Sequence, residues 1–203
     1  MTDLTAPQVV PNWIQGEDRL AISGRTLDKY DPATGRLLCR VARSDQSDVN
    51  DSVVAAKSVQ SAWAAETVAR RGEILRATAM LMMQRRDEIA ALVSSETGKS
   101  RQDALGETGA AIEMGFFVAG EGRRFYGKTT TSGVPGRSAM IVRQPLGVAG
   151  LIIAANTPIA NVAWKVFPAL LCGNAAILKA SEDTPLSAWA FARLLEEAGA
   201  PSG

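Results

Sequence analysis

Leu151–Pro185 reads LIIAANTPIANVAWKVFPALLCGNAAILKASEDTP, and this stretch decides the fold. One apolar run ends at Asn156 and a second ends at Lys179, with helical spacing of apolar residues between them. The pattern predicts a buried strand, a helix and a second buried strand, which is a βαβ unit of a parallel sheet. In such sheets ligands bind outside the carboxyl ends of the strands. Asn156, Lys179 and Glu182 therefore predict a binding edge.

Boundary signals around this unit set its expected limits. The first strand is expected at 148–155. The helix that follows is expected to have Thr157 as its N-cap and Pro158 as its first residue, and to end at Gly173. Pro168 lies inside that helix and is expected to kink it. The second strand is expected at 175–179, and a last helix begins after Thr184 and ends before Gly199.

The segments before the unit alternate between short strands and long helices. Residues 1–11 are expected to form a loose arm, and a turn at 31–35 predicts a hairpin of the strands 27–30 and 37–41. Helices are expected at 48–65 with Ser47 as N-cap, at 69–98 with a break near Arg86–Asp87, and at 100–125. Five glycines in the last of these predict close packing against another element. A strand pair is expected within 127–147. The fold class is α/β.

Composition excludes several classes of function. The chain has 203 residues, 46% apolar residues, a net charge of +1, two cysteines and no histidine. The absence of histidine excludes Ser-His-Asp and Cys-His catalysis and most zinc sites, so no metal is expected. The sequence has no basic patch of the kind that binds nucleic acids or anionic membranes, so neither partner is expected. The N-terminus lacks the pattern of a secretory signal, so a cytoplasmic location is expected.

Each polar residue at the predicted edge has two interpretations. The Asn156 amide could stabilise an oxyanion, or it could bond its own backbone in an Asn-Thr-Pro turn. Lys179 and Glu182 could hold the hydroxyls of a ribose, or they could be solvated loop residues. Lys165 could extend to solvent from its helix, or it could be buried with a lowered pKa. Cys172 lies in an apolar setting that predicts an inert thiol, and only a neighbouring cation distinguishes Cys39.

Several motifs together resemble the N-terminal portion of the aldehyde dehydrogenase superfamily, over nearly the whole chain. The most specific part comprises Asn156-x-Pro158, Lys165-x-x-Pro168-Ala169-Leu170, Gly173-Asn174 and Lys179-x-x-Glu182-x-Thr184-Pro185. Weaker matches are Asp31-Pro32-Ala33-Thr34-Gly35, Arg71-Gly72-Glu73-Ile74-Leu75, Glu96-Thr97-Gly98-Lys99 and Pro145-Leu146-Gly147-Val148.

The resemblance implies NAD-dependent oxidation of an aldehyde to a carboxylic acid through a cysteine thioester, with NADP less favoured as cofactor. It implies that Asn156 holds the oxyanion and that Lys165 lies near a proton-exit route. The cofactor-binding residues that it implies are Ile152, Ile153, Ala154, Ala155, Asn156, Lys179, Ser181 and Glu182. A glutamate at position 182 resembles the NAD-preferring members, because a carboxylate would repel a 2′-phosphate.

The resemblance also implies a domain organisation and an assembly. Residues 1–126 would form the hairpin and helical part of the NAD-binding domain, and 127–147 a β-arm for oligomerisation. Residues 148–203 would be the first βαβα of a doubly wound, Rossmann-like parallel sheet, and the catalytic domain would be absent. A homodimer or homotetramer acting on a small aldehyde is implied, with no nucleic-acid or membrane partner.

The sequence departs from the family pattern in two ways. The aromatic residues that usually flank the asparagine are replaced by Ala155 and Thr157, which leaves the substrate class open. The glycine-rich loop, the general base and the nucleophilic cysteine have no counterpart in the chain. One alternative is therefore a non-catalytic truncated homologue that acts as an assembly subunit. Another is a related reaction on the same fold, such as that of the acylating relatives.

Overall fold

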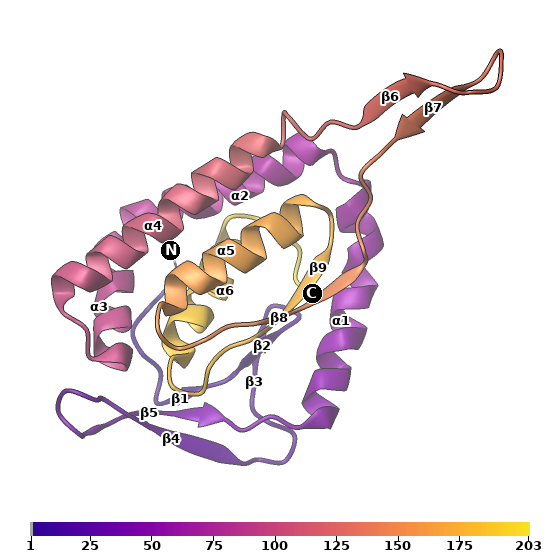
Figure 1. Ribbon diagram of the computed structural model, residues 1–203. Helices are drawn as coiled ribbons and strands as arrows, with labels where there is room; N and C mark the ends of the chain where they lie inside the picture. Colours follow the sequence, from indigo (N-terminus) through magenta and orange to yellow (C-terminus); the bar gives the residue numbers. More distant parts are fainter. Residues whose placement is uncertain (1) are drawn as a thin grey trace.

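A computed structural model describes residues 2–203, which form helices packed around a small parallel sheet (Figure 1). The strands of the N-terminal region are β1 (Val9–Val10), β2 (Asn12–Ile14), β3 (Glu17–Arg19), β4 (Thr26–Tyr30) and β5 (Leu37–Ala42). The later strands are β6 (Lys128–Thr131), β7 (Ser138–Ile141), β8 (Val148–Ile152) and β9 (Ala175–Lys179). The helices are α1 (Gln46–Ala65), α2 (Val68–Gln84), α3 (Arg86–Thr97), α4 (Arg101–Glu121), α5 (Pro158–Leu171) and α6 (Pro185–Glu197).

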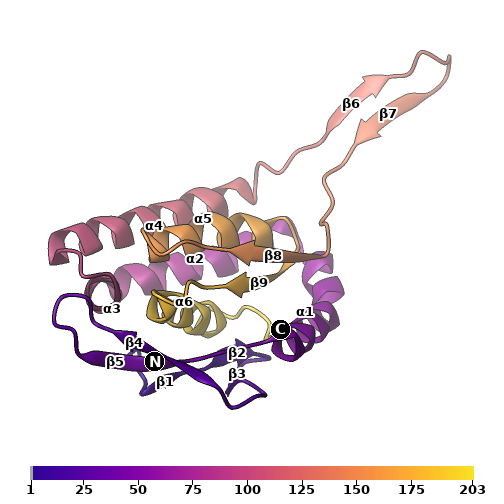
Figure 2. The same cartoon turned by 60° about the horizontal axis from the view of Figure 1, so that its bottom comes forward.

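The N-terminal hairpin is confirmed. Strands β4 and β5 pair antiparallel, and β1 adds to β5 in parallel. The turn between β4 and β5 is closed by Asp31, whose carbonyl accepts from Gly35 N–H at 2.8 Å and whose carboxylate accepts from Ala33 N–H at 2.8 Å. An aspartate that binds the backbone two residues ahead is a common turn device. Figure 2 shows this hairpin beneath the helices.

The long helices agree with the sequence prediction except at the N-cap of α1 and at the end of α4, which lies at Glu121 and not at residue 125. Helix α1 begins at Gln46, so Ser47 is not its N-cap; Asp45 and Asp48 form a capping box instead. That arrangement satisfies two backbone N–H groups, which a single serine could not do. The predicted break between the next two helices is confirmed at Arg85, and Gly98 ends α3 with a φ of 73°.

Close packing of the five glycines is confirmed at Gly115 and at the C-cap residue Gly122, where a Cβ would lie 2.9 Å from the Val68 carbonyl oxygen. A Cβ on Gly115 would lie 2.8 Å from the Ala79 Cβ and 2.9 Å from the Phe167 ring. Gly106 and Gly120 face open space, so the prediction is wrong for them. Gly115 is therefore the position where α4 approaches both α2 and α5. Phe167 in turn packs edge-on against Phe191 of α6, with ring centroids 5.2 Å apart.

The predicted βαβ unit is confirmed and establishes the α/β class. Strands β8 and β9 pair in parallel with Ile152 opposite Lys179, and α5 connects them. The first strand ends at Ile152, three residues earlier than predicted. The unit is the start of a doubly wound sheet, with α1 and α5 packed against the strand pair. None of the helices described, from residue 2 onward, is long and apolar enough to cross a lipid bilayer.

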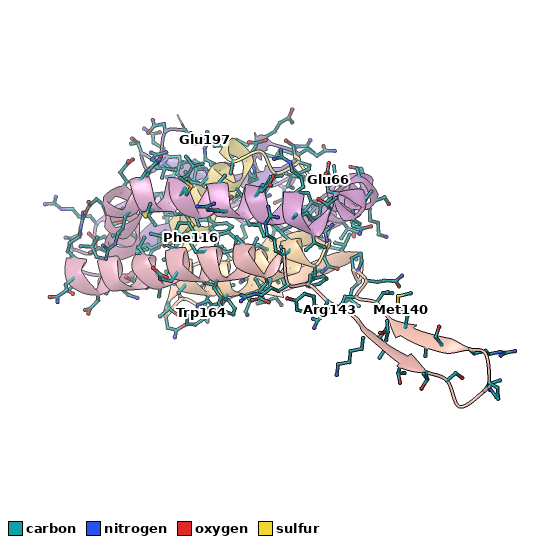
Figure 3. All side chains as sticks on the ribbon, turned by 90° about the horizontal axis from the view of Figure 1, so that it is seen from above. Glu66, Phe116, Met140, Arg143, Trp164 and Glu197 are labelled. Atoms are coloured by element: carbon teal, nitrogen blue, oxygen red, sulfur yellow. The ribbon has the colours of Figure 1, made fainter. Side chains whose placement is uncertain are left out.

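The strand pair expected within 127–147 is a hairpin that projects away from the body of the molecule. Figures 1 and 2 show β6 and β7 extending beyond the helices, and Figure 3 shows Met140 on this extension. Every residue of both strands is exposed, and Met140 is 72% exposed. The hairpin pairs a polar strand, Lys128–Thr131, with a strand that exposes Met140 and Ile141, and neither strand is buried against the rest of the chain.

A buried arginine connects the C-terminal ends of α1 and α5. Arg71 on α2 is 4% exposed and donates to the carbonyl oxygens of Leu171 at 2.9 Å, Ala64 at 3.2 Å and Glu66 at 2.6 Å. The last carbonyls of a helix have no partner within the helix, and a cation there also complements the helix dipole. One guanidinium therefore satisfies several carbonyl groups that would otherwise be buried without donors.

Replacing Arg71 with methionine is expected to lower the free energy of unfolding by about 3 kcal/mol or more, because several buried carbonyls lose their donors. Urea unfolding followed by circular dichroism measures the effect. The exposed Arg76→Met on the same helix is the matched control and should change stability by less than about 0.5 kcal/mol. Equal effects of the two variants would contradict this role of Arg71.

Candidate functional site

Two loops meet at the carboxyl edge of the parallel strand pair. Residues 153–157 follow β8 and residues 180–184 follow β9, and the pairing of Ile152 with Lys179 brings both loops to the same edge. The side chains of Asn156 and Glu182 are exposed there. Loops at this edge are where open parallel sheets bind ligands.

Lys179 and Glu182 form an ion pair in the second loop. The Lys179 Nζ lies 3.0 Å from Glu182 Oε2, and both side chains are 61% exposed. A backbone N–H and then the Lys179 ammonium lower the pKa of the Glu182 carboxyl, so it is ionised at neutral pH. The pair offers a donor and an acceptor side by side to solvent, which is an arrangement that can bind two neighbouring hydroxyl groups. Half-buried Ser181 accepts from the backbone N–H of Asp183 at 3.3 Å.

Asn156 in the first loop is held from two sides. Its backbone carbonyl accepts from Lys99 Nζ at 2.9 Å, and its side-chain Oδ1 accepts from Asn161 Nδ2 at 3.3 Å. The alternative in which the asparagine side chain bonds its own backbone is wrong, because Asn161 on α5 is its partner. Asn156 is exposed and its amide nitrogen has no acceptor among residues 2–203, so it can donate to a bound oxygen atom.

The other predicted residues differ in exposure. Lys165 is exposed and donates from Nζ to the carbonyl of Ile152, so the alternative of a buried lysine is wrong. Ile153 is 4% exposed and its backbone N–H donates to the Lys179 carbonyl at 3.3 Å, whereas Ile152 and Ala154 are exposed and Ala155 is half-buried. A ligand at this edge could therefore contact the exposed side chains of Ile152 and Ala154 but not the buried side chain of Ile153.

The helices behind both loops are capped by carboxylates from elsewhere in the chain. Thr157 and Thr184 occupy the N-cap positions, as predicted, but neither side chain makes a capping bond. Glu107 of α4 accepts from Ile159 N–H at 3.0 Å at the start of α5. Glu96 of α3 accepts from Leu186 N–H at 2.7 Å at the start of α6. Each carboxylate also complements the positive end of a helix dipole.

Glu107 also reaches the Asn156 loop through a lysine. Its second oxygen lies 2.5 Å from Lys99 Nζ, the same group that holds the Asn156 carbonyl. Sequence reasoning missed the role of this carboxylate. Its signal is a glutamate on the same helical face as buried Ala104 and Ala111, where an apolar residue is expected.

Neither cysteine has the properties of a nucleophile. Burial raises the pKa of the Cys39 thiol to about 11, so almost none of it is thiolate at neutral pH. Cys172 lies at the C-terminal end of α5, and the 14 residues of that helix separate it from the Asn156 loop. Both observations agree with the prediction that neither thiol is activated.

An apolar cavity lies beside the second loop. It has a volume of about 890 Å³ and lies against β9, between α1 and α6. Ile177 of β9, Val59 of α1 and Trp189 of α6 contribute to its wall, and Lys179 and Glu182 also line it. Its size is within the range of small-molecule sites.

The chain is similar to proteins of known activity. The model of the aldehyde dehydrogenase family matches residues 20–203. The chain is 38% identical to malonate-semialdehyde dehydrogenase 2 of Bacillus cereus over 203 residues, all of this chain and 42% of that protein. The chain thus spans less than half the length of this relative.

The chain is also similar to solved structures, and it again covers less than half of each of them. An NADP-dependent enzyme of E. coli matches 95% of this chain and 40% of its own, with a TM-score of 0.93 and 34% identity. A methylmalonate-semialdehyde dehydrogenase described as putative, from Sinorhizobium meliloti 1021 and complexed with NAD, matches 96% of this chain and 40% of its own, with a TM-score of 0.92 and 33% identity.

The cap at α6 makes stability depend on pH. Glu96 is 1% exposed, and burial raises the pKa of its carboxyl to about 7, against the opposing hydrogen bonds from Ser187 and Leu186. Because the folded state holds the proton more tightly than the unfolded chain, raising the pH from about 4.5 to 7 favours unfolding, by up to about 3 kcal/mol.

Glu96→Gln keeps an acceptor for the α6 N–H groups and removes this titration. We expect the free energy of unfolding of the variant to change less between pH 5 and pH 8 than that of the wild-type chain. Urea unfolding at one-unit pH intervals measures it, with the exposed Glu113→Gln on α4 as control. Parallel pH profiles for wild type and Glu96→Gln would contradict the assignment.

Proposed function

The chain belongs to the aldehyde dehydrogenase family, and from that premise we propose that it takes part in NAD-dependent oxidation of an aldehyde to a carboxylic acid. The observation that supports this most is the shared edge of β8 and β9, where the Asn156 amide and a lysine–glutamate pair are exposed on adjacent loops. The Asn156 amide could stabilise a developing oxyanion, and the Lys179–Glu182 pair could bind the hydroxyl groups of a ribose.

In this proposal Asn156 donates from Nδ2 to the oxygen of the aldehyde as a cysteine thiolate attacks the carbonyl carbon. A donor already in place when negative charge develops is worth about 3–4 kcal/mol in such reactions. The thiolate and the base that activates water would come from outside residues 1–203, because Cys39 is protonated and Cys172 is remote. Lys165 would take part in proton exit near the Ile152 carbonyl.

The residues at the second loop fit the adenosine part of NAD. The Lys179 ammonium can donate to ribose hydroxyls and the Glu182 carboxylate can accept from them, and both are exposed at the edge that they share with residues 152–155. NAD when bound would supply the acceptor for hydride. The ionised Glu182 would disfavour a 2′-phosphate, which supports NAD over NADP.

Assembly into a homodimer or homotetramer is part of the proposal. Every residue of strands β6 and β7 is exposed and the hairpin projects from the body, so its unpaired strand edges and the side chains of Met140 and Ile141 could be covered by a second copy. The proposed domain limits follow from this, with 127–147 as an arm between the helical part and the parallel sheet.

Removing the amide of Asn156 tests its role. In an active polypeptide that contains residues 1–203, Asn156→Ala is expected to lower kcat by about 10²–10³ while the Kd for NAD stays unchanged. Suitable polypeptides are the full gene product or a chimera in which these residues replace the matching part of the Bacillus cereus relative. The exposed Asn50→Ala on α1 is the control. Unchanged turnover in Asn156→Ala would overturn the proposal.

Glu182→Gln tests the choice of cofactor. Loss of the negative charge should raise kcat/KM with NADP relative to NAD by about tenfold, because one repulsive contact with the 2′-phosphate is removed. The exposed Glu113→Gln on α4 should leave the ratio as it is in wild type. A ratio that does not move in Glu182→Gln would argue against this residue as the selector.

Sequencing past the Gly203 codon, with an intact mass of the natural product, distinguishes the enzyme from the alternative of a non-catalytic assembly subunit. An open frame that continues through a Gly-Gln-x-Cys segment would support the enzyme. A natural product with a mass near 21.4 kDa would support the subunit.

A further inference from the structure

Asn161 contacts the site and has no part in the function proposed above. It lies in the first turn of α5, where its backbone N–H donates to the Thr157 carbonyl at 2.8 Å. Its side-chain Nδ2 donates to Asn156 Oδ1 at 3.3 Å and to the Ala154 carbonyl at 3.4 Å. The two hydrogens of one amide thus connect α5 to two positions of the loop, Ala154 and Asn156.

This contact determines which end of the Asn156 amide faces outward. An asparagine side chain has an oxygen that accepts and a nitrogen that donates, and a half-turn about its last bond exchanges them. Asn161 donates, so the oxygen of Asn156 turns toward α5. Among residues 2–203, none accepts a hydrogen bond from Asn156 Nδ2, which therefore remains available to a ligand.

The backbone of Asn156 is held independently of its side chain. Lys99 Nζ donates to the Asn156 carbonyl at 2.9 Å, and Lys99 is itself held by Glu107 at 2.5 Å. With the backbone held from one side, the remaining freedom of the residue is rotation of its amide. The Asn161 side chain is the partner that restricts this rotation.

We propose that Asn161 is a positioning residue that keeps the amide nitrogen of Asn156 directed at the oxyanion of the reaction, an inference that rests on the proposed function. Without Asn161 the amide could turn its oxygen toward the developing negative charge, which would repel it. Preorganised donors are effective because they need no reorientation when the charge forms.

Two substitutions at position 161 separate orientation from packing. Asn161→Ala removes the donor and leaves the Asn156 amide free to rotate. Asn161→Asp has nearly the same shape but can only accept, so it draws Asn156 Nδ2 away from the substrate. We expect kcat to fall about tenfold in Asn161→Ala and about 10²-fold in Asn161→Asp, with KM changed less than kcat. A packing role predicts the opposite order, because aspartate fills the same space as asparagine.

A measurement on the 203-residue chain tests the same point without turnover. In a ¹⁵N-labelled sample, the side-chain NH₂ signals of Asn156 are assigned by their loss in Asn156→Ala. In Asn161→Asp these protons should shift downfield, because they now donate to a carboxylate. In Asn161→Ala they should stay near the positions of a solvent-exposed amide. Signals of Asn156 that are the same in Asn161→Asp as in wild type would overturn the inference.

The outcomes also distinguish this inference from the function on which it rests. If Asn156→Ala keeps full turnover, the proposed oxyanion role fails, and the amide signals still report whether Asn161 orients the side chain. If Asn156→Ala loses turnover but Asn161→Asp loses no more than Asn161→Ala, the proposed function stands and the orienting role of Asn161 is wrong.

Discussion

The interaction on which the site depends is the capping of two helices by buried carboxylates from distant parts of the chain. Helices α5 and α6 begin with proline and lack a local side-chain cap, so their first N–H groups need an acceptor in a region closed to water. Glu107 and Glu96 supply it. Because both carboxylates come from the adjacent helices α3 and α4, this helix pair is attached to each of the two loops at the binding edge.

Anchoring at both ends makes α5 a rigid support for the first loop. The Glu107 carboxylate accepts a hydrogen bond at its N-terminal end, and the Arg71 guanidinium donates one to a carbonyl at its C-terminal end. Each charge has the sign that the helix dipole favours. Gly115 allows α4 to approach the same helix closely along its length. The position of Asn161 on α5, and through it the amide of Asn156, is thereby defined by contacts far from the loop itself.

The groups that support the two loops are buried, whereas the groups that could contact a ligand are exposed. Glu96, Glu107 and Arg71 are each less than 10% exposed, whereas Asn156, Lys179 and Glu182 are all exposed. Rigid elements that are held by their own packing keep functional groups in place better than loops do alone. The exposed side chains therefore need no further contacts of their own to stay in place.

The sequence by itself determined the α/β class, the βαβ unit and the edge where Asn156, Lys179 and Glu182 gather, because apolar periodicity and turn residues are local signals. It also located most helix ends. The N-cap of α1 is an exception, because it is Asp45 and not Ser47, and the capping box of Asp45 satisfies two N–H groups. Only the tertiary structure decided that distant carboxylates replace the side chains of Thr157 and Thr184 as functional caps, and that Asn161 orients the amide. Those outcomes depend on contacts across 52 and 90 residues of the chain and on side-chain rotation, and no local pattern encodes either of them.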